Sequence, residues 1–150
     1  MNPKSIGNLL VGIQFGTLVV LAQQAWSTGQ VASHQILIWL LLGSSGAVGV
    51  WALSANQPGN FNIHPTPHQN GRLIDHGPYR WIRHPMYTSV LLFGAAMAAA
   101  ITSVNAWLLW ILLAGALLSK AVLEERWMTQ KHPAYTAYRA RTRRFVPYIL

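Results

Sequence analysis

Long apolar stretches alternate with short polar stretches along this chain. The apolar stretches are nearly free of charge and cover residues 6–26, 36–55, 86–103 and 106–123. A bilayer core about 30 Å thick takes roughly 20 apolar residues of helix, because each residue adds about 1.5 Å. The pattern therefore predicts an all-α polytopic membrane protein with about four transmembrane helices. Only Val104 and Asn105 separate the last two, which we expect to form a tight helical hairpin.

Charge is confined to a few parts of the chain, and this supports the same interpretation. Only 9% of the 150 residues are charged and 52% are hydrophobic, whereas about 25% charged is usual in soluble proteins. Lys4 stands alone near the start, and residues 5–71 and 84–119 contain no Asp, Glu, Lys or Arg. We therefore expect residues 1–150 to form one integral membrane domain. The absence of cysteine excludes disulfides, thiolate metal sites and a cysteine nucleophile.

The basic residues also predict an orientation. The links 27–35 and 104–105 contain no Lys or Arg, whereas the N-terminus, the central loop 56–84 and the segment after Ser119 contain all of them. Four spans place these three regions on one side, which the positive-inside rule makes cytoplasmic. The net charge of +8 then reflects this bias and an attraction to membrane lipids with anionic headgroups, rather than to nucleic acid. The tail from Glu124 to Arg141 is compatible with a C-terminal interfacial helix, interrupted by Pro133.

Two adjacent acids, Glu124 and Glu125, provide nearly all the negative charge of the chain, and the only other acid is Asp75. Ionisable groups beside hydrocarbon are costly, so they indicate a functional site with a positive partner. If the last two spans form a hairpin, His84 at the base of one returns close to Glu124 at the base of the other. Pro85 suits the first turn of the third span, where its missing N–H costs nothing.

The second half of the chain resembles a known superfamily. Residues 77–87 read G-P-Y-R-x-x-R-H-P-M-Y; an apolar hairpin, E-E, Y-x-x-Y and a basic stretch ending at Val146 and Pro147 follow. This pattern is similar to that of the isoprenylcysteine carboxyl methyltransferase and phospholipid methyltransferase superfamily. The resemblance covers residues 65–147, and the first two spans match only as generic hydrophobic helices. The segment Lys131-His132-Pro133 departs from the Phe-Gly pair that usually precedes the two tyrosines.

The resemblance implies an S-adenosylmethionine-dependent membrane methyltransferase. Its substrate would be a lipophilic acceptor that enters from the bilayer and reacts at the cytoplasmic face. The residues it assigns to the cofactor are Tyr79, Arg83, His84, Pro85, Tyr87, Glu124 and Glu125. The residues it places near the acceptor and the reaction are Arg141, Arg144 and Glu125. Whether the acceptor ends in a carboxylate, a thiol or an amine stays open.

The chemistry of the cofactor is compatible with these residue types. A carboxylate accepts hydrogen bonds from the ammonium and the ribose hydroxyls, and arginine or histidine holds the cofactor carboxylate. The sulfonium is a cation that gains about 0.5–2 kcal/mol against a tyrosine face.

Simpler interpretations exist for each feature. Lys120 and Glu124 are spaced to form a helical salt bridge, and the arginines would serve equally as headgroup anchors. His64 and His68 flank Pro65-Thr66-Pro67, which excludes the helical spacing of zinc-binding pairs, so we expect no metal. Among functions, the alternatives are a membrane reductase that uses a nicotinamide cofactor, and a small channel or lipid- or ion-binding membrane protein without enzymatic activity.

Overall fold

Helices account for the fold, as the hydropathy pattern predicts. The computed structural model describes residues 3–28, 35–56 and 73–149. Its elements are α1 (Pro3–Thr28), α2 (Gln35–Ala55), the 3-10 helix η1 (Gly77–Arg80), α3 (Pro85–Ile101), α4 (Val104–Lys131) and α5 (Tyr135–Arg141). Within these described residues the backbone pairing outside helices is one parallel bridge between Ile82 and Arg143. The predicted all-α fold is confirmed.

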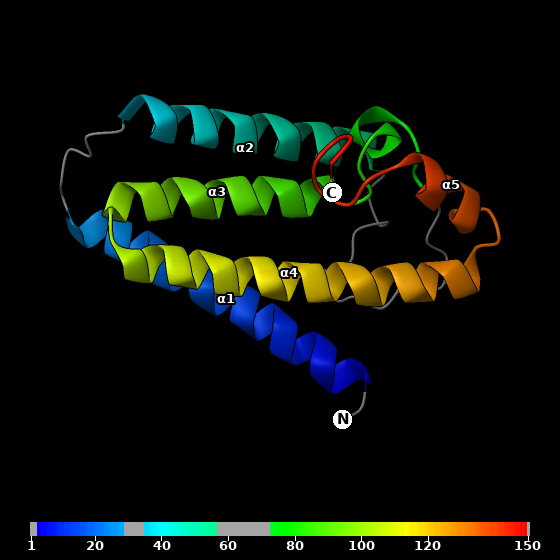
Figure 1. The fold of residues 1–150 in the computed structure, drawn as a ribbon, viewed down its shortest axis with the longest axis horizontal. Coiled ribbons are helices and arrows are strands. Elements are labelled where there is room, and N and C mark those ends of the chain that lie inside the picture. Colours follow the sequence, from blue (N-terminus) through cyan, green and yellow to red (C-terminus); the bar gives the residue numbers. More distant parts are fainter. Residues whose placement is uncertain (1–2, 29–34, 57–72, 150) are drawn as a thin grey trace.

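The long helices run alternately up and down and lie side by side. Helix α3 packs between α2 and α4, and α1 crosses α4 obliquely and also contacts α3 (Figure 1). The start of α1, the described residues 73–84 before α3, and α5 all lie at one end of the bundle, and the α3–α4 turn lies at the other (Figure 1). All the basic segments of the described chain therefore gather at one end, as four spans require.

Three helices are long and apolar enough to cross a bilayer. The segments concerned are Ser5–Ser27, Gln35–Ala55 and Val104–Lys131. The third expected span corresponds to α3, a shorter apolar helix of 17 residues. At 1.5 Å per residue α3 extends about 25 Å, near the lower limit for a membrane span. The protein is an integral membrane protein built from these helices.

The hairpin forms where the sequence predicts it, but the helix boundaries differ. The turn lies at Thr102 and Ser103 rather than at Val104 and Asn105. Thr102 adopts the left-handed conformation with φ 55°, and the Ser103 side chain accepts a hydrogen bond from the Ala106 N–H at 3.2 Å. Serine is a preferred N-cap because its oxygen satisfies one of the free N–H groups of the first turn. This cap starts α4 two positions earlier than the apolar pattern alone indicates.

Helix α4 also continues beyond the predicted span. The sequence analysis places Glu124 and Glu125 just after the helix, whereas both lie within it and α4 ends at Lys131. The residues beyond the apolar run are good helix formers. The helix ends before His132 because the next residue, Pro133, disfavours helical backbone at that position. The two glutamates are therefore fixed on a rigid element.

Polar contacts join neighbouring helices inside the bundle. Ser45 Oγ donates to the Ser89 carbonyl and Ser89 Oγ donates to the Ser45 carbonyl, each at 2.8 Å. A side chain on Gly49 would meet Ser89 Oγ at 2.9 Å, so glycine permits this close approach of α2 and α3. On the other side of α3, Trp110 Nε1 of α4 donates to the Leu91 carbonyl at 2.9 Å. Small residues and interhelical hydrogen bonds are what pack helices together where lipid removes the hydrophobic driving force.

A glycine turn brings the segment before α3 under the end of α2. Gly77 has φ +59°, and a Cβ at this position would lie 2.7 Å from the Ala55 Cβ. Glycine adopts the left-handed region without steric cost, and here the space also excludes any side chain. Next to this turn the rings of Trp51 and Trp81 lie 5.5 Å apart between centroids. The backbone of residues 81–84 is thereby held at the base of the hairpin.

Candidate functional site

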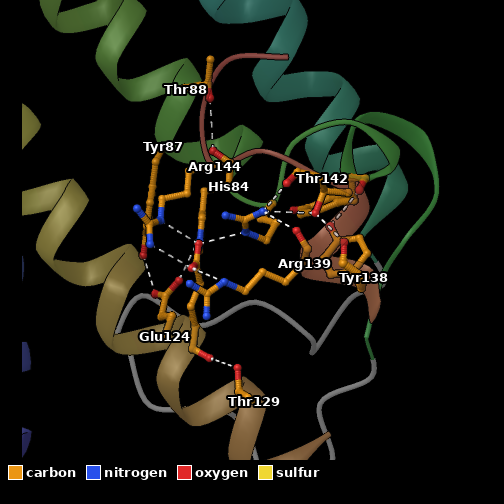
Figure 2. Close-up of polar contacts among 12 residues, drawn as sticks. His84, Tyr87, Thr88, Glu124, Thr129, Tyr138, Arg139, Thr142 and Arg144 are labelled. Atoms are coloured by element: carbon orange, nitrogen blue, oxygen red, sulfur yellow. Dashed lines mark hydrogen bonds and ion pairs between the residues drawn. The ribbon is translucent and has the colours of Figure 1, made fainter. Parts of the chain in front are cut away.

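The C-terminal tail returns to the base of α3 and completes a polar cluster there. The Arg83 N–H donates to the Arg143 carbonyl at 2.7 Å, and the His84 N–H donates to the Arg144 carbonyl at 3.0 Å. In the first turn of α3, Thr88 Oγ1 donates to the Phe145 carbonyl at 2.7 Å (Figure 2). These bonds fix the tail beside the two glutamates of α4.

Glu125 is buried among three arginines. Its side chain is 2% exposed, and Arg83 Nε donates to Oε1 at 2.9 Å. Arg144 donates from Nε to Oε1 at 3.0 Å and from Nη2 to Oε2 at 3.2 Å. Arg139 Nε lies 3.6 Å from Oε2. A buried carboxylate needs such partners because burial removes its hydration, and here the cations outnumber the acid.

Arg83 links this carboxylate to the end of α5. Its side chain is 7% exposed. Besides the bond to Glu125, Nη1 donates to the Arg139 carbonyl at 3.2 Å, to Thr142 Oγ1 at 3.3 Å and to the Thr142 carbonyl. The planar guanidinium, with five N–H groups, suits a site that needs several acceptors satisfied at once. Arg83 therefore connects α4, α5 and the tail through its hydrogen bonds.

His84 lies between the two carboxylates. Its Nδ1 is 3.4 Å from Glu124 Oε2, and its Nε2 is 3.4 Å from Glu125 Oε1. The ring also stacks on Tyr87, with centroids 5.3 Å apart and planes 3° apart. Burial of the imidazole opposes its charged form, but the contacts with Glu124 and Glu125 outweigh burial and raise the pKa of His84.

This arrangement predicts how the charge of His84 depends on pH. Because its folded-state pKa is raised above the ordinary value of about 6.5, the contact stabilises the fold fully below about pH 6.5. That stabilisation is lost as the pH rises through the folded-state pKa. NMR titration of histidine-labelled protein, with the His84 signal assigned by its loss in His84→Ala, should give a midpoint above 6.5. Glu124→Gln should lower this midpoint, and a wild-type midpoint at or below 6.5 would contradict the arrangement.

Glu124 differs from its neighbour because its side chain is partly exposed, at 21%. The Tyr87 hydroxyl donates to Oε1, and His84 contacts Oε2 (Figure 2). The charge of Glu124 also affects Tyr79. Burial, as the larger cause, and the negative charge of Glu124 together raise the pKa of Tyr79 to about 12. Of the two glutamates, Glu124 is the one whose side chain retains accessible surface.

Comparison with known proteins assigns the chain to a family. Residues 37–135 match the model of the phospholipid methyltransferase family. The chain belongs to the phospholipid methyltransferase family. No curated protein and no solved structure matches it. The resemblance noted in the sequence is thus confirmed at family level, and membership in a methyltransferase family supports an enzyme that acts on lipid substrates.

The family match covers the hairpin and the two glutamates but not the whole cluster. It includes α2, α3 and α4 and ends at Tyr135, the first residue of α5. Arg139 and Arg144, two of the three arginines around Glu125, lie beyond the match, as does all of α1. These parts of the site are therefore described by the geometry of this chain alone.

The structure brings most of the sequence-predicted site residues together. Those in the cluster are Arg83, His84, Tyr87, Glu124, Glu125 and Arg144. Pro85 occupies the first turn of α3, as expected, and is buried. Tyr79 lies in η1, where its backbone carbonyl accepts a hydrogen bond from the Tyr138 hydroxyl at 2.7 Å. The hairpin explains this convergence, because it places the ends of α3 and α4 side by side.

Arg141, which the resemblance places near the acceptor, lies outside the cluster around Glu125. Its Nη2 donates to Asp75 Oδ2 at 2.8 Å, and its side chain is 62% exposed. Arg139 takes the place beside Glu125 instead. Both belong to α5, and residues two apart in a helix differ in direction by about 200°. Only one of these two arginines can therefore face α4. The helical spacing of the segment that begins with Y-x-x-Y was the sequence signal that could have separated the two arginines.

Two further contacts were not anticipated by the sequence analysis. Lys120 does not form the suggested salt bridge with Glu124; its Nζ donates to Gln14 Oε1 of α1 at 2.6 Å. Thr142, which is 1% exposed, connects Arg83 to the Tyr138 carbonyl. The Lys120–Gln14 and Arg83–Thr142 contacts do not follow from local pattern, because each joins segments far apart in sequence. No metal-binding group of three His, Asp or Glu side chains occurs among the residues that the structure describes, and His64 and His68 lie outside them.

Proposed function

We propose that the protein transfers a methyl group from S-adenosylmethionine to a lipophilic acceptor at the membrane face. Family membership supports the methyltransferase class. The observation that carries the choice of donor is Glu124, a partly exposed carboxylate held by Tyr87 and His84. The neighbouring Glu125 pairs with Arg139 and Arg144, which are both partly exposed. Such a cluster suits a ligand with a cationic, a hydroxyl-rich and an anionic part.

The residues present fit the polar groups of S-adenosylmethionine. Glu124 would accept hydrogen bonds from its ammonium or ribose hydroxyls. Arg139 and Arg144 are 51% and 29% exposed, so part of each guanidinium remains available for its carboxylate. Arg83 and Glu125 are nearly fully buried. We assign these two a supporting role, in which they hold Arg139, Arg144 and His84 in place.

S-adenosylmethionine would supply an electrophilic methyl group, whose carbon bonds to the nucleophile in line as the C–S bond breaks and S-adenosylhomocysteine leaves as a neutral thioether. The contribution of the chain is then alignment and the exclusion of water, since well-oriented reactants gain very large effective concentrations. The Tyr87 ring already stacks on His84 and contacts Lys120, so the ring of Tyr79 is the one on which a sulfonium cation would be stabilised. A carboxylate or thiolate acceptor needs no general base, whereas an ammonium acceptor must first lose a proton. The acceptor class stays open among these.

We also propose an orientation of the site in the membrane. The basic end of the bundle, which carries the start of α1, the cluster and α5 (Figure 1), faces the cytoplasm under the positive-inside rule. The acceptor would reach it laterally from the bilayer. Labelled methyl transfer into a total lipid extract would identify the acceptor.

Binding of the demethylated product, S-adenosylhomocysteine, tests the proposal directly. Calorimetry on purified protein in detergent should detect binding, and Glu124→Gln should weaken it at least about tenfold, or about 1.4 kcal/mol. Asp75→Asn is the matched control, because Asp75 is exposed and pairs with Arg141 outside the cluster; it should bind like the wild type. Absence of binding to a sample shown to be folded would refute the proposal.

A further inference from the structure

A lysine lies buried in the middle of the bundle and has no part in the cluster around Glu125. Lys120 of α4 is 1% exposed, the lowest value of any charged side chain described in the structure. Its Nζ donates to Gln14 Oε1 of α1 at 2.6 Å. Gln14 is itself 7% exposed. A neutral amide does not compensate an ammonium, and an ionisable group at this depth is costly enough to indicate a function.

Gln14 lies at the centre of the face by which α1 joins the bundle. The buried residues of α1 are Gly7, Gln14, Thr17 and Leu21. Their spacing by seven, three and four positions places them on one side of the helix. Helix α1 packs with this side on α4 and α3 (Figure 1). The Gln14–Lys120 contact therefore sets where α1 meets the hairpin.

The same lysine reaches toward the candidate donor-binding carboxylate through a tyrosine. Lys120 Nζ lies 5.0 Å from the centroid of the Tyr87 ring, within the range of a cation–π contact. The Tyr87 hydroxyl in turn donates to Glu124 Oε1. Lys120 and Glu124 are one turn apart on α4, so their opposite charges also attract each other. Gln14, Lys120, Tyr87 and Glu124 thus form a continuous path from α1 to the cluster.

We propose that Lys120 is a positioning residue. It holds the Tyr87 ring so that the hydroxyl stays on Glu124, and Gln14 fixes the lysine from α1. This gives the first helix, which lies outside the family match, a role in the site. The inference rests on the proposed function only in its effect on ligand binding, since the effect on Tyr87 is independent of any ligand.

The first readout is affinity for S-adenosylhomocysteine. Lys120→Met keeps the length of the side chain but removes its charge, and we expect binding about tenfold weaker than in the wild type. Lys120→Arg should recover part of this loss. Ser45→Ala is the control, since it removes a buried polar contact between α2 and α3 that does not touch Tyr87. It should bind as the wild type does, even if it lowers the melting temperature.

The second readout reports on Tyr87 without ligand. In protein labelled with 13C at the tyrosine ζ position, the Tyr87 resonance is identified by its loss in Tyr87→Phe. Lys120→Met should shift this resonance, whereas Ser45→Ala should leave it in place. A folded Lys120→Met protein with an unshifted Tyr87 signal or with wild-type affinity would overturn the inference. If the wild type binds no ligand, the proposed function fails, and the Tyr87 shift alone then decides the positioning role.

Discussion

Replacing Glu125 with glutamine is expected to lower the free energy of unfolding by about 3–5 kcal/mol. The substitution keeps the size of the side chain and its helix propensity but removes the charge that three arginines and His84 share. Arg83, at 7% exposure, would remain buried without a carboxylate. The loss should be visible by equilibrium unfolding in detergent micelles, as a much lower midpoint.

The same substitution one position earlier provides the control. Glu124→Gln removes a carboxylate that is 21% exposed and should cost only about 1 kcal/mol, because its hydrogen bond from Tyr87 can be retained by an amide oxygen. We therefore expect Glu125→Gln mainly to lower stability and Glu124→Gln mainly to weaken ligand binding, although the two changes are chemically identical and adjacent. Equal stability of the two variants would show that the arginines do not depend on Glu125.

Replacing Arg83 with methionine is expected to cost about 3 kcal/mol of stability. The change removes the shortest ion pair to Glu125, at 2.9 Å, and leaves the carbonyl groups of Arg139 and Thr142 without their donor. Since Arg83 is one of the links between α4 and the tail, besides Arg144, the C-terminal segment should also become more accessible. Limited proteolysis of the tail and equilibrium unfolding measure the two effects.

Arg80→Met is the matched control for this experiment. Arg80 is exposed and lies three residues earlier, in η1, with its guanidinium 6.0 Å from the Trp81 ring centroid. Exposed substitutions of this kind usually change stability by no more than about 0.5 kcal/mol. Arg83→Lys should recover only part of the stability, because an ammonium lacks the planar fork. A full recovery by lysine would mean that charge alone, rather than the shared hydrogen bonds, holds the tail.

Much of the site was predictable because it depends on local pattern. Apolar runs define helices, Pro85 marks the start of α3, and a hairpin must bring His84 near Glu124; the structure has these two side chains 3.4 Å apart. The ends of α4 were less predictable. The Ser103 cap starts the helix before the apolar stretch, and the good helix formers after Leu123 extend it beyond that stretch.

The sequence pattern alone could not predict which arginine of α5 lies beside Glu125. Composition indicates a basic tail, but only the rotation of α5 about its axis decides that Arg139 faces Glu125 and Arg141 faces Asp75. That rotation is set by the return of the tail along residues 81–84 and by Tyr138, whose hydroxyl donates to the Tyr79 carbonyl. Such contacts join segments about sixty positions apart, and no local periodicity encodes them.

The sequence by itself determined the apolar helices, the hairpin, the gathering of charge at one end and the residues Glu124 and Glu125 as the centre of the site. Hydropathy suffices for this, because bilayer thickness and the cost of buried charge act on each segment separately. Only the tertiary structure decided that Glu125 is enclosed by arginines while Glu124 stays partly exposed, and that Lys120 contacts Gln14. Adjacent residues on a helix point about 100° apart, so which one is buried depends on the neighbours that pack there.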